Sequence, residues 1–250
     1  MCGRYVIYSA DELIDLHDIV EEAQRRADAA QREAQGKAGA SRSEAQGKAS
    51  ASRSEAQLQA DFTDGKIQNQ TSKLLKVKTG EIFPTNIAPI LIPSTTNPTD
   101  LTLRRFESHP MIWGYPQFGS KKGVVINTRL ETAGEKPFWR DSLMQRRCVV
   151  PSSGFFEWQH GGPFDKQRYL FDLPDEPILY LAGIYKAFPA ADTALLERFS
   201  ILTTAPNNSI RAVHDRMPVV LRSEELAEWL YGDPFAFIDR SGIELRQREV

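Results

Sequence analysis

Short apolar runs dominate the chain from Thr79 onward, and they predict β-strands. Each run is rich in β-branched or aromatic residues and is bounded by proline, glycine or asparagine, as strands commonly are. The runs are IAPILI (87–92), MIWGY (111–115), GVVIN (123–127), RCVVP (147–151), RYLFDL (168–173), ILYLAGIY (178–185) and FSILTT (199–204). Two helices are predicted among them, one over about Pro137–Arg146 and one over SEELAEWL (223–230), with Ser223 as its N-cap.

The order of these elements favours an α+β fold. Strands and helices do not alternate regularly, so a doubly wound parallel sheet is disfavoured. No change of composition typical of a linker follows Thr79. We therefore expect a single domain built around a mixed, curled, barrel-like β-sheet that helices flank.

The first quarter of the chain has a different pattern. The stretch SADELIDLHDIVEE (9–22) begins with a capping box, Ser9 and then Glu12, and its large apolar residues fall on one helical face, which predicts a helix. The stretch EAQGKAGASRS (33–43) returns as EAQGKASASRS (44–54) with a period of 11 residues. Its apolar positions are nearly all alanine, so it offers no seam for a coiled coil. We expect a low-complexity, solvated insertion rich in Ala, Glu and Gln over about residues 22–61, partly helical or disordered.

Composition and charge exclude several classes of protein. The 250 residues are 41% hydrophobic and 26% charged, as in an ordinary globular protein, and the formal net charge is −2. A nucleic-acid site would need a local basic patch, because the chain as a whole is not basic. Two cysteines are too few for a disulfide framework or a structural zinc site. The sequence shows neither a signal-peptide pattern nor a bilayer-spanning apolar run. We expect a cytoplasmic monomer with no metal, cofactor or membrane partner.

Cys2 follows the initiator methionine directly, in MCGRY. Removal of Met1 would give Cys2 a free α-amine beside its thiol. An α-amine has a pKa of about 7.7–8.0, so near neutral pH part of it is nucleophilic and forms a Schiff base with an aldehyde. The thiol can then close a five-membered thiazolidine ring on the same carbon with little further loss of entropy. Cys2 would equally serve as the nucleophile of an amidohydrolase, or it is a small buried residue without a chemical role.

Two motifs offer groups for proton transfer. In GFFEWQ (154–159), Glu157 lies between two aromatic residues; desolvation there would raise the pKa of its carboxyl and suit it to acid–base catalysis. The alternative is a solvent-facing Glu on an amphipathic strand. In VHDRMPVVL (213–221), His214 is suited to proton transfer near neutrality and Arg216 to holding a phosphate or carboxylate. The alternative there is a structural histidine, with Arg216 paired to an acid such as Asp215.

A fourth motif, INTRLET (126–132), follows an apolar run. Asn127 at the end of that strand is placed to point its amide into a cleft, and Arg129 follows on the same side if the chain stays extended. A turn role for Asn127 is the alternative, because strand ends often use asparagine.

Together these motifs resemble the SRAP family of abasic-site processing proteins, which in bacteria are linked to the SOS response. The resemblance covers residues 1–19 and about 80–230. The blocks that carry it, in order, are MCGRY (1–5), PTNIAP (84–89), WGY (113–115), INTRLET (126–132), GFFEW (154–158) and HDRMP (214–218). It implies a sensor of abasic sites in single-stranded DNA, in which Cys2 forms a thiazolidine crosslink with the ring-opened sugar.

The resemblance also implies roles for individual residues. Asn127 would orient the cysteine and the sugar, Glu157 would be the acid–base group beside the Schiff base, and His214 would assist ring opening and reversal. The positions that match DNA contacts are Arg4, Asn86, Pro89, Trp113, Arg129, Thr203 (or its neighbour Thr204) and Arg216.

Three functions stay open at this point. The first is covalent capture of abasic sites in single-stranded DNA, with lyase activity through the Schiff base, by a protein that joins the nucleoid when it acts. The second is an N-terminal-nucleophile cysteine peptidase or amidohydrolase, which also removes its own Met1; it needs an oxyanion hole that the sequence does not locate. The third is a non-catalytic single-strand binder that uses arginines and aromatic side chains.

Overall fold

The computed structural model describes residues 3–7, 17–30, 32–33, 76–94, 106–117, 123–159, 166–189 and 195–250. Cys2 lies outside these residues, and so do residues 34–75, which hold nearly all of the repeats. Over residues 34–61 the low-complexity insertion therefore stays a prediction.

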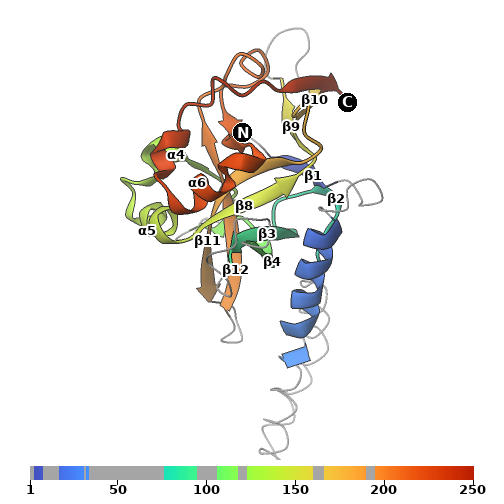
Figure 1. Cartoon of the computed structure of the whole chain (residues 1–250), viewed down its shortest axis with the longest axis vertical. Helices are drawn as coiled ribbons and strands as arrows, with labels where there is room; N and C mark the ends of the chain where they lie inside the picture. Colours follow the sequence, from blue (N-terminus) through green and yellow to red (C-terminus); the bar gives the residue numbers. More distant parts are fainter. Residues whose placement is uncertain are drawn as a thin grey trace, which may run out of the picture.

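Five strands close into a barrel (Figure 1). They are β3 (Ile87–Pro93), β4 (Phe106–Trp113), β8 (Arg147–Ser152), β11 (Leu179–Pro189) and β12 (Leu195–Thr204). The ring closes because β11 pairs with β8 on one side and with β12 on the other. The β12–β4 pair is parallel and the other pairs of the ring are antiparallel. Three short strands extend this sheet, β7 (Asn127–Arg129), β13 (Met217–Pro218) and β14 (Val220–Leu221). The expected mixed, barrel-like sheet is confirmed.

A second sheet of five antiparallel strands packs beside the barrel, in the order β15–β10–β9–β1–β2. Its strands are β1 (Arg4–Ile7), β2 (Gly80–Ile82), β9 (Gly154–Trp158), β10 (Arg168–Asp172) and β15 (Arg246–Glu249). The chain passes from barrel to second sheet at Ser153, between β8 and β9. The carbonyl of Val6 accepts hydrogen bonds from the Ser153 N–H (2.7 Å) and from the Ser152 hydroxyl (3.0 Å). These bonds fix β1 at the junction of the two sheets.

The buried strands explain why the apolar runs of the sequence are continuous. All six residues of β8 and the first six of β11 are buried. The barrel interior covers one face of these strands, and α4, α5 and α6 lie together over the other side of the barrel (Figure 1). A strand that is covered on both faces carries apolar residues at successive positions rather than alternate ones. A small separate ladder joins β5 (Tyr115–Pro116) to β6 (Val124–Val125).

The predicted helices are largely confirmed. The first is α5 (Pro137–Gln145), preceded by the short α4 (Leu130–Ala133). The second is split into a 3₁₀ turn, η3 (Ser223–Glu225), and α6 (Leu226–Tyr231), followed by η4 (Pro234–Phe237). Ser223 is not the N-cap that we expected: the Glu225 carboxylate instead accepts from the Arg222 N–H at 2.8 Å. Glu225 is held in this position because its carboxylate also binds the guanidinium of Arg240.

A helix over residues 17–30 packs against the barrel edge (Figure 1). It confirms the last part of the predicted helix, and its residues 22–30 fall in the segment that we expected to be a solvated insertion, partly helical or disordered. Ala23 and Ala27 are fully buried against Val77, Ile87 and Ile112. Alanine is small enough to let the helix approach the sheet closely, so an alanine-rich pattern forms a packed face here rather than a solvated one.

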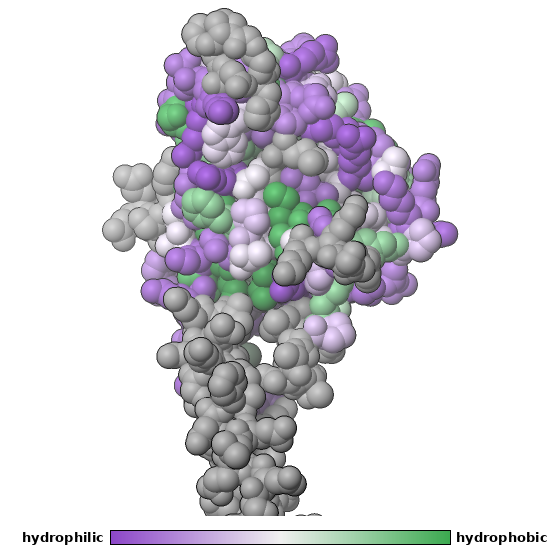
Figure 2. Space-filling model, turned by 180° about the vertical axis from the view of Figure 1, so that it is seen from behind, coloured by the Kyte–Doolittle hydropathy of each residue, from purple (hydrophilic) through white to green (hydrophobic). Residues whose placement is uncertain are grey.

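One face of the molecule is mostly polar. Figure 2 shows hydrophilic side chains over much of one face, with hydrophobic residues gathered near its centre. Among the described residues, no helix combines the length and the apolar character that a membrane span requires.

The packed alanine face predicts the effect of a buried charge. Ala27→Asp should lower the free energy of unfolding by at least about 2 kcal/mol, because it places a carboxylate against apolar side chains. Ala29→Asp is the matched control, since Ala29 is exposed on the same helix. Urea denaturation measures both variants. Equal losses would show that this helix does not stay docked in solution.

Candidate active site

The pairing of β1 with β9 brings the start of the chain to Glu157. Arg4 pairs with Phe156 in antiparallel register, so one further step sets Gly3 opposite Glu157. Side chains alternate across a strand, so Tyr5 and Glu157 belong to the face that lies toward the barrel. Cys2, the next residue toward the terminus, lies outside the described residues.

Glu157 is a buried acid. Its exposed fraction is 1%, so the solvent-facing alternative is excluded. Burial raises the pKa of its carboxyl from 4.5 to about 7, and the negative charge of Asp215 contributes to the increase. A carboxyl group with this pKa is present in both protonation states near neutral pH, which is what acid–base catalysis requires.

His214 sits at the end of a turn before β13. Its side chain is 10% exposed, and its Nδ1 lies 2.9 Å from the Arg216 N–H, which donates to it. The Arg216 carbonyl lies 3.1 Å from the same Nδ1, so this nitrogen accepts from the Arg216 N–H when it is bare and donates when it carries a proton. The Asp215 carboxylate lies 3.0 Å from the same Nδ1 and stabilises the ring when that nitrogen is protonated.

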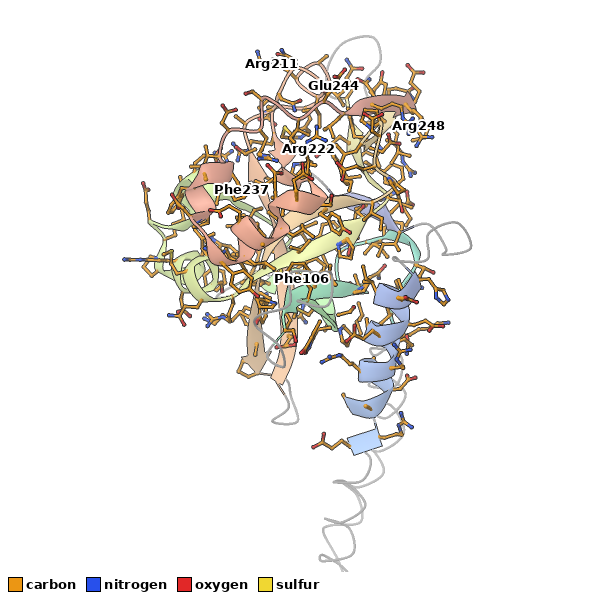
Figure 3. The ribbon with its side chains drawn as sticks, in the orientation of Figure 1. Phe106, Arg211, Arg222, Phe237, Glu244 and Arg248 are labelled. Carbon is orange, nitrogen blue, oxygen red and sulfur yellow. The ribbon has the colours of Figure 1, made fainter. Side chains whose placement is uncertain are left out.

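The structure brings Glu157 and the His214 turn together. The Gln159 side chain, at the end of β9, reaches the Ala212 carbonyl at 3.4 Å. An open hollow of about 740 Å³ adjoins the turn, and Arg211 lies beside it at the end of the molecule farthest from residues 17–30 (Figure 3). The hollow is lined by Ala205, Pro206, Arg211, Ala212, Val213, His214 and Asp215.

Asn127 lies on a third element, β7. It begins β7, which runs parallel to β12 with Asn127 beside Ile201, and its side chain is half-buried. The carbonyl just before it, on Ile126, accepts from the indole N–H of Trp113 at 3.0 Å. The Trp113 ring in turn meets the Tyr5 ring edge-on at 5.2 Å. Trp113 and Tyr5 thus connect the peptide before Asn127 to β1, the strand whose first residues lie opposite Glu157.

The predicted phosphate-binding arginines differ in their surroundings. Arg129 is exposed. Arg4 is 36% exposed; it pairs with Glu81 at 3.7 Å and stacks over the ring of Phe83 at 4.5 Å. Arg216 is only 12% exposed, because both of its terminal nitrogens bind the Glu131 carboxylate, at 2.7 and 2.8 Å. Arg216 therefore clamps α4 to the barrel, and Arg129 is the arginine that faces solvent.

Three residues that we expected to contact DNA are buried inside the protein. Pro89 is buried in the middle of β3, Trp113 is fully buried between β1 and β12, and Thr203 is fully buried in β12. Asn86 closes a turn, since its side-chain oxygen accepts from the Phe83 N–H at 3.1 Å. The side chains of these residues make contacts within the protein rather than forming a surface for DNA.

A surface stack of arginines and aromatic rings escaped the sequence analysis. The Arg168 guanidinium lies 3.8 Å from the Phe156 ring centre, and Trp158 lies between Arg168 and Arg4, at 5.7 and 5.1 Å. Phe83, which is 39% exposed, completes the stack. The alternation in GFFEW places Phe156 and Trp158 on one face, but only strand pairing shows that two arginines cover them.

No set of three or more His, Cys, Asp or Glu side chains in the described ranges could hold a metal ion together.

Comparison with known proteins places this geometry in a family. Abasic site processing protein YoqW of Bacillus subtilis is 37% identical over 106 residues, which is 42% of this chain and 47% of YoqW. Abasic site processing protein YedK of Escherichia coli is 31% identical over 121 residues, which is 48% of this chain and 54% of YedK. The chain thus spans about half the length of the curated relatives it matches.

The fold and the family model agree with these relatives. A crystal structure of a protein from Bacteroides thetaiotaomicron superposes with a TM-score of 0.55 at 28% identity, over 68% of this chain and 77% of that one. A protein from Bordetella bronchiseptica shares the fold at 17% identity and a TM-score of 0.57. The model of the SOS response associated peptidase (SRAP) family matches residues 45–237, more than half of the chain, so the protein belongs to the SRAP family.

Proposed function

We propose that this protein captures abasic sites in single-stranded DNA covalently, through Cys2 after removal of Met1. The observation that carries the proposal is a buried carboxyl group with a pKa of about 7, opposite the strand end that leads to Cys2. The substrate class is supported by the relatives, several of which are named abasic site processing proteins. An abasic deoxyribose in its ring-opened form is an aldehyde, the electrophile that suits an aminothiol.

The proposed reaction balances without a co-reactant. The Cys2 amine attacks the sugar aldehyde, water leaves, and a Schiff base forms. The thiol sulfur then bonds to the same carbon while the thiol proton moves to nitrogen, which closes the thiazolidine ring. Glu157 gives a proton to the departing hydroxyl and takes one from the attacking amine, and a pKa near 7 allows both steps at neutral pH. The same Schiff base also permits elimination of the 3′ phosphate, which would be a lyase activity.

His214 and Asn127 have the remaining roles in the proposal. His214 moves a proton at the ring oxygen of the sugar, so that the closed hemiacetal opens to the aldehyde; Asp215, at 3.0 Å, stabilises its charged form. Asn127 holds the sugar and the aminothiol in position through its amide.

DNA would be held by Arg129 and by the surface cluster of Arg4 and Arg168, in which DNA phosphates would take the place of the Glu81 carboxylate that binds both arginines. Arg129 faces solvent, and Arg4 and Arg168 stack with aromatic rings on the outer face of β1, β9 and β10. Alternating guanidinium groups and rings suit the phosphates and bases of a single strand and need no net positive charge on the whole protein. Phosphate contacts of this kind supply affinity without sequence preference.

A denaturing gel tests the proposed function. Wild-type protein incubated with an oligonucleotide that contains one abasic site should give a shifted band that survives heating. Cys2→Ala should abolish the band while the melting temperature is retained. Cys2→Ser keeps the amine but not the thiol, so its adduct should require borohydride reduction to survive. Intact mass should show that Met1 has been removed from the active protein.

Other outcomes of that experiment would overturn the proposal. Turnover of peptides with no DNA band would favour an N-terminal-nucleophile peptidase. Salt-sensitive binding with neither activity would favour a non-catalytic binder. Retention of Met1 on most molecules would exclude both the capture of abasic sites and the N-terminal-nucleophile peptidase.

Arg129 is expected to contribute a phosphate contact. In a Cys2→Ala background, which removes the covalent step, Arg129→Ala should weaken single-strand binding and reduce the slope of log K against log salt by about 0.7. Arg140→Ala is the matched control, because Arg140 is exposed on α5, away from the site. Fluorescence anisotropy across a salt series measures both variants. An unchanged slope for Arg129→Ala would remove it from the DNA surface.

The raised pKa of Glu157 predicts a pH dependence of stability. Between pH 4.5 and about 7 the folded protein binds a proton that the unfolded chain has released, so the wild type loses stability as pH rises through this window. Glu157→Gln lacks this loss, so its stability relative to the wild type should rise by on the order of 3 kcal/mol from pH 4.5 to 8 and then stay constant.

Urea unfolding at a series of pH values checks this prediction. Glu244→Gln, at an exposed position, is the control and should show no such trend (Figure 3). A constant difference between Glu157→Gln and the wild type would mean that the carboxyl is hydrated and has its ordinary pKa.

A further inference from the structure

Trp113 joins three elements of the site without reaching the surface. Its ring is fully buried; it meets Tyr5 of β1 edge-on at 5.2 Å and stacks on Phe199 of β12 at 6.3 Å with an interplanar angle of 9°. A large ring held by packing on two sides has one available rotamer, so its polar edge has a fixed direction.

The polar edge of Trp113 is directed at the peptide that precedes Asn127. The indole N–H donates to the Ile126 carbonyl at 3.0 Å, and the same oxygen accepts from the Ile201 N–H at 3.0 Å. Two donors on one carbonyl use both of its lone pairs and fix the plane of the Ile126–Asn127 peptide. That plane sets the backbone direction at Asn127, and therefore where its half-buried amide points.

The backbone of Trp113 is fixed as firmly as its ring. Its N–H donates to the Asn86 carbonyl and its carbonyl accepts from the Thr85 N–H, both at 2.9 Å. The following Gly114 has φ +107°, and a Cβ there would lie 2.8 Å from the side chain of Val124. Only glycine fits this position, so the backbone next to Trp113 has a conformation that other residues could not adopt without strain.

We infer that Trp113 is a positioning residue: its indole N–H holds Asn127 in register with β1, the strand that leads to Cys2. This inference rests on the proposed capture reaction, in which groups from two separate elements must meet on one sugar carbon. A single rigid side chain between β1 and the Asn127 peptide keeps those two elements at a constant separation. It also gives a role to a tryptophan that is buried too deeply to touch DNA.

The test removes the indole N–H donor and keeps an aromatic ring at position 113. Trp113→Phe should lower the maximal rate of crosslinking at saturating DNA by about tenfold, because a small displacement of a positioned group is costly in rate. The half-saturating DNA concentration should stay unchanged, since no DNA contact is lost. Trp229→Phe is the matched control: Trp229 is also fully buried and donates to a carbonyl, that of Cys148, at 2.9 Å, but on α6. That variant should change the rate less than twofold.

A double-mutant cycle separates positioning from general destabilisation. If Trp113 acts through Asn127, then Trp113→Phe should slow crosslinking by less than twofold in an Asn127→Ala background. A full tenfold loss in that background, or an equal loss in Trp229→Phe, would overturn the inference.

A spectroscopic arm keeps the inference testable if the reaction or the variant fails. In ¹⁵N-edited NMR the side-chain amide signals of Asn127 should shift in Trp113→Phe and stay in place in Trp229→Phe. If Trp113→Phe does not fold, benzothienylalanine at position 113, which replaces the N–H by sulfur in a ring of the same shape, takes its place. Absence of crosslinking by the wild type would refute the proposed function alone, whereas an unmoved Asn127 signal would refute the positioning role.

Discussion

The site depends on the pairing of one four-residue strand. β1 has β9 on one side and β2 on the other, so its backbone groups are held along both edges. Its side chains are buried on both faces, Tyr5 against Trp113 and Val6 against Phe156 and Leu170. Because a shift of one residue would exchange these two faces, the register of β1 is strongly determined. The approach of Gly3 to Glu157 follows from that register.

Burial of Glu157 is the second condition, and it comes from the junction of the two sheets. The face of β9 that carries Glu157 lies toward the barrel, and the opposite face carries the aromatic rings on which two arginines stack. The fold keeps a carboxyl group out of water there at a cost to its ionised form. Such a cost is typical of functional sites, where a group is tuned at some expense of stability.

The arginines divide into those that hold the fold and those that face solvent. Arg216, the residue before β13, binds Glu131 of α4. Arg147, buried beside Trp229, donates to the carbonyls of Leu143 in α5 and Leu230 in α6. Arg129 is exposed at the end of β7, one residue before α4 begins. The same residue type, in motifs only a few residues long, thus serves stability in one place and a candidate DNA surface in another.

The sequence by itself determined the apolar strands of the barrel, the helix α5, the α+β class and the motifs that carry Asn127, Glu157 and His214, because local propensity and short-range patterns control these features. It did not indicate β1, β2 or β15, because these short strands are set by pairing with distant partners. Only the tertiary structure decided which face each residue occupies. It buried Glu157, removed Pro89, Trp113 and Thr203 from the surface, turned Arg216 into a clamp and packed an alanine-rich helix on the barrel. The physical reason is that burial depends on partners far away in the chain: a strand pattern fixes alternation, but the neighbours across the sheet fix what each side of it meets.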